Sequence, residues 1–466
     1  MLFYAVLFPI FAILFCIMPV NSRVSHIFSK FFLSLQFLTV IHMLYCQYND
    51  PFLHYYFIDK RLFNANSISM IFVLLTSFLS LLCLLYSRQY SEVFSICFLL
   101  LNLDLVLFFT TDHLLLFYIF LEFSLIPVFF IIGIWGSEGK IYSSFKFILY
   151  TVVGSISFLV AIIYTYNETN TLVISDLSVI LTTNLDIGIQ KLLWLAFFIS
   201  FAVKIPMIPF HTWLPFAHVQ APASGSAMLA GILIKMGGYG MLKILLPVFP
   251  NVSVCFSDYV IIMSVVAVIF ASCVAFVQDD IKKVIAYSSV AHMGLVTGGM
   301  FSLNTTAINA AVFQMISHGL ISSGLFFCIG MLYDRSHTRE IKKYSGLAVS
   351  MPVFSTFFII LSMSSLGLPG TSGFIGEMFS IVGIIENNIF YGSLSATSVV
   401  LTAGYMIWLS KQIIWGSDNG FITNDISRKE IFILVSLVIP VIFLGIYPQI
   451  VFSLVKNHAM SLLLVR

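Results

Sequence analysis

Long runs of apolar residues dominate the chain, and short polar segments separate them. A helix needs about 20 apolar residues to cross the hydrocarbon core of a bilayer. Runs of this length predict an all-α polytopic membrane protein with about fourteen membrane-spanning helices. The predicted spans are 1–20, 31–48, 68–86, 93–111, 113–135, 145–166, 190–205, 223–246, 259–277, 284–301, 307–332, 351–390, 393–415 and 430–453.

Two of these runs are interrupted. The first stops at Lys204, where the chain becomes rich in proline, and a continuous helix is not expected there because proline lacks a backbone donor. These prolines are Pro206, Pro209, Pro215 and Pro222. The run 351–390 would form a helix about 60 Å long, twice the ~30 Å core, and it contains the sequence GLPGTSG at 367–373. Two interrupted helices in corresponding halves indicate an inverted repeat of the transporter type.

The composition narrows the class of protein. Hydrophobic residues make up 60% of the 466 residues, and charged residues make up 9%, against roughly 25% in soluble domains. The mean hydropathy is +1.04 and the net charge is +2. These values exclude a soluble globular protein, a disordered chain and a nucleic-acid-binding protein. The seven cysteines form no CxxC pair, so we expect small buried side chains rather than a metal or cluster site. The apolar N-terminus predicts no cleavable presequence.

Lysine and arginine are distributed unevenly among the predicted loops. Odd-numbered loops contain twelve: Arg23, Lys30, Arg88, Lys140, Lys282, Lys283, Arg335, Arg339, Lys342, Lys343, Arg428 and Lys429. Even-numbered loops contain three: Lys60, Arg61 and Lys191. The positive-inside rule therefore predicts that odd-numbered loops face the matrix or cytoplasm, and that both termini face the opposite side.

Ionisable residues inside the spans are candidate functional residues, because a charge at the bilayer centre costs from about 3 to over 10 kcal/mol. These residues are Asp104, Glu122, Lys146, Lys204, Lys235, His292, His318 and Glu377. Plainer explanations exist for three of them. Asp104 can pair locally or lie nearer an interface, Lys146 can extend its ammonium to the membrane surface, and His292 can be a structural histidine beside Gly294.

The residue types suit proton transfer. Burial lowers the pKa of a lysine and a nearby carboxylate raises it, so moving a carboxylate can make a buried lysine release a proton. Histidine suits intermediate positions, because its ordinary pKa is near neutrality. Two acids and two lysines at membrane depth are therefore interpreted as a paired relay. Nearly equal lengths of chain separate Glu122 from His292, Lys204 from Glu377, and Lys235 from Lys411, which also favours an internal duplication.

Five sequence motifs resemble one known family. Residues 201–240 read FAVKIPMIPFHTWLPFAHVQAPASGSAMLAGILIKMGGYG. The other four are LLLFYIFLEFSLIP at 114–127, DDIKKVIAYSSVAHMG at 279–294, QMISHGL at 314–320 and SLGLPGTSGFIGE at 365–377. They closely resemble the subunit 4 family of proton-pumping NADH:quinone oxidoreductase, respiratory complex I. The resemblance extends from about residue 65 to 450.

The resemblance implies a fold of fourteen helices, with two inverted five-helix repeats and discontinuous helices 7 and 12. It divides the chain into an N-terminal three-helix segment at 1–92 and a first antiporter-like repeat at 93–250. A second, inverted repeat follows at 251–416, and a final helix and tail at 417–466.

The resemblance also implies roles for individual residues. Glu122 and Lys204 match a charged pair on helices 5 and 7, Lys235 a central lysine, and Glu377 a terminal acid. The remaining matches are histidines: relay residues His292 and His318, and His211 and His218 near the side of proton uptake. Lys146 is a further secondary candidate. Many bacterial members have an acid where this chain has Phe216, so an acidic role at that position is absent.

The family assignment implies partners, cofactors and a location. We expect proton translocation coupled to quinone reduction elsewhere in a complex, beside sister subunits 2 and 5, in the mitochondrial inner membrane or a bacterial plasma membrane. NADH, FMN, iron–sulfur clusters and ubiquinone would be bound by other subunits. The sequence alone leaves open a subunit of a multisubunit sodium/proton antiporter or of a proton-coupled membrane hydrogenase. A scaffold bundle without conduction is disfavoured by the buried ionisable residues.

Overall fold

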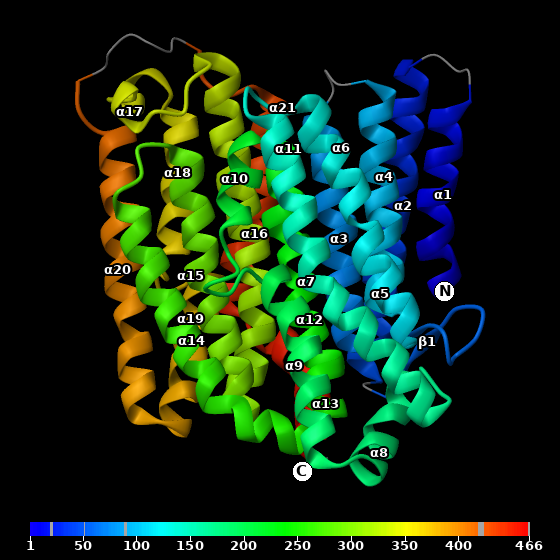
Figure 1. The fold of residues 1–466 in the computed structure, drawn as a ribbon. Coiled ribbons are helices and arrows are strands. Elements are labelled where there is room, and N and C mark those ends of the chain that lie inside the picture. The colour runs from blue at the N-terminus through cyan, green and yellow to red at the C-terminus, as the bar shows by residue number, and fades with distance from the viewer. Residues whose placement is uncertain (19–21, 51, 88–90, 418–423, 465–466) are drawn as a thin grey trace. The chain divides into compact units, whose positions relative to one another are not determined.

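A computed structural model describes residues 1–18, 22–50, 52–87, 91–417 and 424–464, and nearly all of them are helical (Figure 1). The first half contains α1 Leu2–Ile17, α2 Ser22–Asn49, α3 Ser67–Tyr86, α4 Glu92–Thr110, α5 Leu114–Phe123, α6 Leu125–Trp135, α7 Lys140–Thr169, α8 Ile174–Asn184, α9 Ile187–Lys204, α10 Trp213–Gln220 and α11 Ala223–Met228. The second half contains α12 Ile234–Gly240, α13 Leu246–Val248, α14 Pro250–Phe276, α15 Ile281–Phe301, α16 Thr305–Ser336, α17 Leu347–Ser350, α18 Pro352–Ser365, α19 Ser372–Asn387, α20 Ile389–Ile414, α21 Arg428–Ile446 and α22 Gln449–Leu464. Two short strands, β1 Tyr55–Tyr56 and β2 Asn64–Ala65, pair antiparallel.

The prediction of about fourteen spans is confirmed. Twelve helices of the described part are long and apolar enough to cross a membrane. The shorter apolar helix α1 and the pair α18 and α19 supply two more. Arg88, one of the cations assigned to an odd-numbered loop, lies outside the described residues.

Both predicted interruptions are present. Helix α9 ends at Lys204, and the chain becomes helical again in α10. Helix α18 ends at Ser365, and α19 begins at Ser372. Between them Gly367 and Gly370 have φ of +80° and +91°, a backbone conformation that glycine adopts without steric cost.

Some predicted boundaries were wrong. The run 430–453 covers two helices, α21 and the start of α22, because Pro448 cannot donate the next helical hydrogen bond. Helix α8 was not predicted, since its polar residues give it a weaker apolar signal. The predicted run 113–135 is present as one span, Leu114–Trp135, with a local interruption between α5 and α6 at Ser124.

The chain forms two compact units. Unit 1 comprises Met1–Ile205, Ile232–Phe256 and Ser453–Arg466, and unit 2 comprises Pro206–Gly231 and Ser257–Phe452. The units describe which segments pack together, whereas the predicted repeats concern internal symmetry. The repeat boundaries therefore stay a prediction.

In unit 1, glycines bring α12 close to the end of α9. A Cβ added at Gly237 would lie 2.7 Å from both the backbone nitrogen of Ile205 and the carbonyl oxygen of Phe201. A Cβ at Gly240 would lie 2.5 Å from the Phe201 ring. The absence of side chains at both positions therefore lets α12 pack directly against the helix end that carries Lys204.

The helix 223–248 departs from regular α geometry on both sides of Lys235. Residues Leu229–Leu233 (η1) and Met241–Leu245 (η2) are π-helical, and α12 lies between them. A π-helical turn accommodates an extra residue and is frequent at functional sites.

In unit 2, α19 packs against α16 through small residues. A Cβ at Gly376 would lie 2.1 Å from Oε1 of Gln314, and one at Gly383 would lie 2.3 Å from the Cβ of Ala307. Small residues permit this close approach of membrane helices. Glu377, which follows Gly376, is thereby brought against α16.

Candidate functional site

In unit 1, Lys204 is the last residue of α9, and its side chain is buried among α5 and α6. It is 3% exposed. Its Nζ donates to Oγ of Ser124 at 3.2 Å and to the carbonyl oxygen of Leu121 at 3.4 Å. The interruption between α5 and α6 at Ser124 therefore supplies oxygen atoms that hold the ammonium inside the apolar helices.

Glu122 lies one residue before the end of α5 and is half-buried. Its carboxylate interacts electrostatically with Lys204, and the hydroxyl groups of Ser155 and Tyr118 are among its polar neighbours. No ion pair within 4.0 Å joins Glu122 to Lys204 among the described residues. The structure thus brings this predicted pair into electrostatic range without a direct contact.

Lys235 lies in α12 and is fully buried, at 0% exposure. Its place between two π-helical turns was not visible in the sequence. Lys411 was paired with Lys235 by its spacing along the chain. It is instead exposed in the last turn of α20. The two lysines therefore differ in environment.

The other two candidates of unit 1 have distinct positions. Asp104 lies in the middle of α4, is 2% exposed, and neither of its carboxylate oxygens has a hydrogen-bond partner among the described residues. It interacts electrostatically with Lys204. Lys146 is half-buried in the second turn of α7, with its Nζ 5.7 Å from the centre of the Tyr142 ring.

Asp112 and Lys243 form an ion pair in unit 1 that sequence analysis missed. The Lys243 ammonium lies 3.9 Å from Oδ1 of Asp112 and donates to the carbonyl oxygen of Thr111 at 2.6 Å. Burial raises the pKa of Asp112, and the Lys243 ammonium opposes that shift. The pair ties the segment before α5 to η2, the π-helical turn that follows Lys235.

In unit 2, His292 and Glu377 are in direct contact. Nδ1 of His292 in α15 lies 2.8 Å from Oε1 of Glu377 in α19, although the two atoms are not aligned as a hydrogen bond. The other ring nitrogen of His292 lies 3.5 Å from Oγ of Ser365, at the end of α18. His292 is 4% exposed and Glu377 is 2% exposed. Both nitrogens of this buried imidazole therefore face groups that can exchange a proton.

His318, in α16, lies beside this pair. The ring centres of His318 and His292 are 5.5 Å apart. A small cavity, about the size of one water molecule, adjoins both rings. Its polar lining includes Ser288, His292, Gln314, His318, Ser365 and Glu377. Gln314 belongs to the motif QMISHGL, but the sequence did not predict it as a site residue.

His211 and His218 are also buried in unit 2. His211 lies in the segment before α10, and its ring has the ring centres of Phe270 in α14 and Tyr287 in α15 at 5.9 and 6.3 Å. His218 lies in α10 and stacks on Phe326 of α16, with ring centres 4.5 Å apart and planes inclined by 7°. Phe326 follows His318 by eight residues, about 12 Å along the helix. Helix α16 thus contacts His218 at one level and carries His318 about two turns away.

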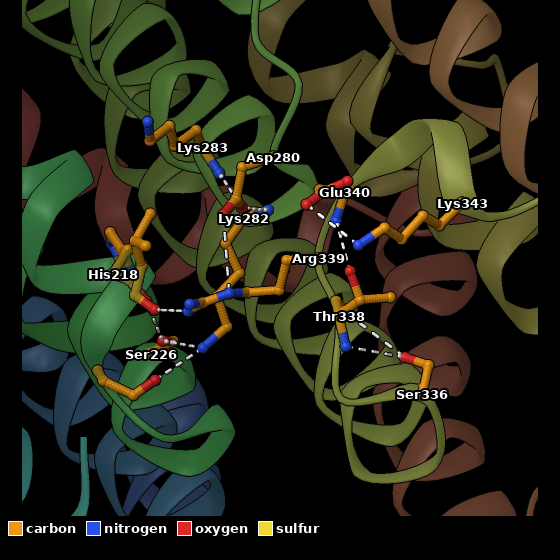
Figure 2. Close-up of polar contacts among 12 residues, drawn as sticks. His218, Ser226, Asp280, Lys282, Lys283, Ser336, Thr338, Arg339, Glu340 and Lys343 are labelled. Carbon is orange, nitrogen blue, oxygen red and sulfur yellow. Dashed lines mark hydrogen bonds and ion pairs between the residues drawn. The ribbon is translucent and has the colours of Figure 1, made fainter. Parts of the chain in front are cut away.

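Lys282 is a buried cation that sequence analysis placed among the loop charges. It is 5% exposed, and its Nζ donates to the carbonyl oxygen of Ala221 at 2.7 Å. Figure 2 shows it beside His218, Ser226 and Arg339. The sequence feature that could have revealed Lys282 is its position two residues after Asp280. Asp280 caps the start of α15 and so places Lys282 in the first turn of that helix.

The described residues include no group of three or more His, Cys, Asp or Glu placed to hold a metal ion. The buried ionisable groups that the sequence predicted fall into two sets, one in each unit. Unit 1 contains Asp104, Glu122, Lys204 and Lys235, and unit 2 contains His211, His218, His292, His318 and Glu377.

Residues 111–402 match the model of a family described as "NADH:quinone oxidoreductase/Mrp antiporter, TM". This match covers more than half of the chain. The chain belongs to that family. All of the candidate residues except Asp104 lie within the matched range.

Individual members of the NADH:quinone oxidoreductase/Mrp antiporter family match most of the chain. NADH-quinone oxidoreductase subunit M of Rickettsia typhi is 48% identical over 412 residues, covering 86% of this chain and 82% of that protein. NADH-ubiquinone oxidoreductase chain 4 of Marchantia polymorpha is 44% identical over 393 residues, covering 83% and 79%. The predicted resemblance to subunit 4 of complex I is confirmed by these relatives.

A solved structure has the same fold. A chain of respiratory complex I from Thermus thermophilus with bound NADH superposes with a TM-score of 0.89 at 25% identity, covering 99% of this chain and 100% of that one. The predicted antiporter-like fold is therefore confirmed for this member of the NADH:quinone oxidoreductase/Mrp antiporter family.

Proposed function

We propose that this chain is a proton-translocating membrane subunit of an NADH:quinone oxidoreductase. The observation that carries the proposal is the contact of 2.8 Å between Nδ1 of His292 and Oε1 of Glu377, deep within membrane-spanning helices. The identity of 48% with a quinone oxidoreductase subunit supports this function over the sodium/proton antiporter and hydrogenase alternatives.

His292 would exchange a proton between two partners. Imidazole binds or releases a proton near neutral pH, and its two nitrogens allow uptake on one side and release on the other. Glu377 faces one nitrogen, Ser365 faces the other, and the small cavity between His292 and His318 has room for about one water molecule. These groups make up the proposed relay of unit 2, with His211 and His218 as secondary members.

Lys204, Lys235 and Glu122 would make up the proposed relay of unit 1. Oxygen atoms of Leu121 and Ser124 bind the Lys204 ammonium, and Glu122 lies in electrostatic range of it. Movement of the Glu122 side chain changes the stabilisation of that ammonium, because Coulomb energies are large where water is scarce. Lys204 and Glu122 can therefore convert a change in the local electric field into proton uptake or release. Lys146 is a secondary candidate.

The chain would contribute to an enzyme without holding a redox centre. NADH oxidation, with FMN and iron–sulfur clusters, and ubiquinone reduction would take place in other subunits. Sister antiporter-like subunits 2 and 5 are the proposed neighbours, in the mitochondrial inner membrane or in a bacterial plasma membrane. The excess of Lys and Arg in odd-numbered loops supports an orientation with those loops in the matrix or cytoplasm.

The test replaces Glu377 in the assembled complex. Glu377→Gln keeps the shape of the side chain and removes its exchangeable carboxyl proton. We expect NADH-driven proton pumping in proteoliposomes to fall roughly tenfold or more, because proton transfer by a positioned group commonly contributes that much. NADH oxidation with an artificial acceptor should remain. Glu386→Gln is the matched control, since Glu386 is an exposed residue of the same helix.

Two results would contradict the proposal. Full pumping by an assembled Glu377→Gln complex would remove Glu377 from the path. Sodium-dependent proton exchange by a small complex that does not oxidise NADH would favour the antiporter alternative.

A further inference from the structure

The carbonyl end of α10 is held by side chains from three other segments (Figure 2). The Lys282 ammonium donates to the carbonyl oxygen of Ala221 at 2.7 Å, and Nη1 of Arg339 donates to that of Val219. Oγ of Ser226 donates to the carbonyl oxygen of His218 at 3.0 Å. The last carbonyl groups of a helix have no partner within the helix, so these three donors supply hydrogen bonds that the helix itself cannot make.

The two cations suit this position electrically. The C-terminus of a helix carries a partial negative charge, and Lys and Arg side chains stabilise it. Helix α10 has eight residues, about two turns, and a helix of that length is not stable by itself. Contacts with the rest of unit 2 must therefore fix its position.

Asp280 links the two cations to the start of α15. Its Oδ1 accepts from the backbone nitrogens of Lys282 at 2.7 Å and Lys283 at 3.2 Å, which caps that helix. Its Oδ2 lies 3.7 Å from Nε of Arg339. Asp280 therefore fixes the helix start from which Lys282 extends, and it neutralises Arg339.

Backbone hydrogen bonds tie the same two segments together. The backbone nitrogen of Ile281 donates to the carbonyl oxygen of Arg339 at 3.0 Å, and that of Ile341 donates to the carbonyl oxygen of Asp279 at 2.9 Å. Arg339 and Lys282 thus reach α10 from two segments that are themselves joined.

His218 is the ionisable residue that this arrangement positions. It lies in the last turn of α10, and its ring is stacked on Phe326. A shift of the helix end would move the ring along α16 and change its separation from His318. Proton transfer between neighbouring groups is sensitive to displacements of about 1 Å.

We propose that Lys282 and Arg339 are positioning residues of the proton path, which hold His218 in place by capping the carbonyl end of α10. This inference rests on the proposed function, because it assigns His218 to the path. Asp280, Asp334 and Arg339 are the charged groups that act on Lys282. The two carboxylates compensate the positive charges of Lys282 and Arg339 within the same cluster.

The experiment compares five variants of the assembled complex in proteoliposomes, and Arg339→Met is the fifth. Lys282→Met removes both the donor and the charge, and Lys282→Arg keeps both. Lys283→Met is the matched control, because Lys283 is exposed at the next position of the same helix. Glu377→Gln reports on the proposed function itself. NADH-driven pumping is recorded between pH 6 and 8.5, with NADH oxidation by an artificial acceptor as the measure of assembly.

We expect Lys282→Met to lower pumping roughly tenfold and to change its pH profile, since a displaced His218 would titrate in different surroundings. Lys282→Arg should restore most of the pumping, and Lys283→Met should match the wild type. Arg339→Met should reproduce the loss, because it removes the donor to Val219.

Normal pumping with an unchanged pH profile in Lys282→Met would overturn the inference, as would an equal loss in Lys283→Met. If Lys282→Met does not assemble, Arg339→Met decides, because it removes the donor to the carbonyl oxygen of Val219: lowered pumping with a changed pH profile supports the inference, and normal pumping with an unchanged profile overturns it. If Glu377→Gln pumps normally, the proposed function fails. If only Glu377→Gln loses pumping, the inference alone fails.

Discussion

At the residue scale, two carboxylic acids with equal burial differ in their surroundings. Glu377 and Asp104 are each 2% exposed. Glu377 lies 2.8 Å from a ring nitrogen of His292, whereas neither carboxylate oxygen of Asp104 has a hydrogen-bond partner among the described residues. Burial alone therefore does not tell which of the two acids belongs to the proposed proton path. The presence or absence of an ionisable group in direct contact distinguishes them.

Replacing Asp104 provides a test of that distinction. We expect Asp104→Asn to change pumping by less than about 1 kcal/mol in activation free energy, roughly a fivefold change in rate. Asparagine has nearly the same shape, and no hydrogen bond to a carboxylate oxygen is lost. Lys204 keeps the oxygens of Leu121 and Ser124. NADH-driven acidification of vesicles is the measurement, with Glu122→Gln as reference, and a loss equal to that of the reference would refute the distinction.

Some site residues were predictable from sequence because an isolated charge in an apolar run is conspicuous. Lys204, Lys235 and Glu377 were found in this way, and all three are buried. Lys282 was not, because it lies in the polar sequence DDIKK beside the exposed Lys283. Distinguishing the two lysines requires knowing which side of α15 faces α10, and sequence polarity does not contain that information.

At the element scale, glycines set the position of the acid in α19. The helix approaches α16 so closely that Gly376 has no room for a side chain. Gly367 and Gly370 allow the sharp interruption before α19 through their positive φ. The sequence GLPGTSGFIGE therefore encodes both the break and the close packing of the helix after it.

Adding one methyl group should test this packing. In Gly376→Ala the new Cβ would lie 2.1 Å from Oε1 of Gln314 and 2.8 Å from its Cα. We expect a loss of about 1–3 kcal/mol in stability, because overpacking forces neighbouring groups to move. The thermal dissociation temperature of the purified complex would measure it. Gly133→Ala is the control, since its nearest neighbour is 3.5 Å away, and an equal loss there would contradict the argument.

Element boundaries were predictable where sequence composition changes sharply. The prolines after Lys204 and the glycines at 367–373 predicted both interruptions, and both are present. The π-helical turns around Lys235 were not predictable, because an apolar sequence fits α and π geometry equally well. Between the two turns, Gly237 and Gly240 of α12 approach α9 closely.

At the scale of the whole molecule, the asymmetry of charge among loops predicts one orientation in the membrane. Lys60 precedes β2 in an even-numbered loop, and Lys342 follows α16 in an odd-numbered loop. Both side chains are exposed, Lys342 to 85%. The two positions should therefore face opposite compartments.

Cysteine labelling in oriented vesicles tests the orientation. We expect an impermeant maleimide to label Lys60→Cys from one side only and Lys342→Cys from the other only, because the positive-inside rule places odd-numbered loops in the matrix or cytoplasm. The wild-type chain, with exposed Cys255 and Cys273, gives the background. Labelling of both variants from the same side would be incompatible with this topology.

The two π-helical turns have a consequence for the gene. Each accommodates about one residue more than a regular helix, and each added residue rotates the remainder of the helix by about 100°. Loss of a single codon within Leu229–Leu233 would leave an equally apolar segment, still long enough to insert into a bilayer. Because the π-helical turn holds one residue more than regular α geometry needs, that loss would close it to an α-helical turn and leave Lys235 on the same side. The same deletion within α12, which has regular α geometry, would rotate one flank of the helix by about 100°. An in-frame deletion of one apolar residue should therefore be tolerated within Leu229–Leu233 and not within α12, so the tolerance of this helix to a change in length differs along it.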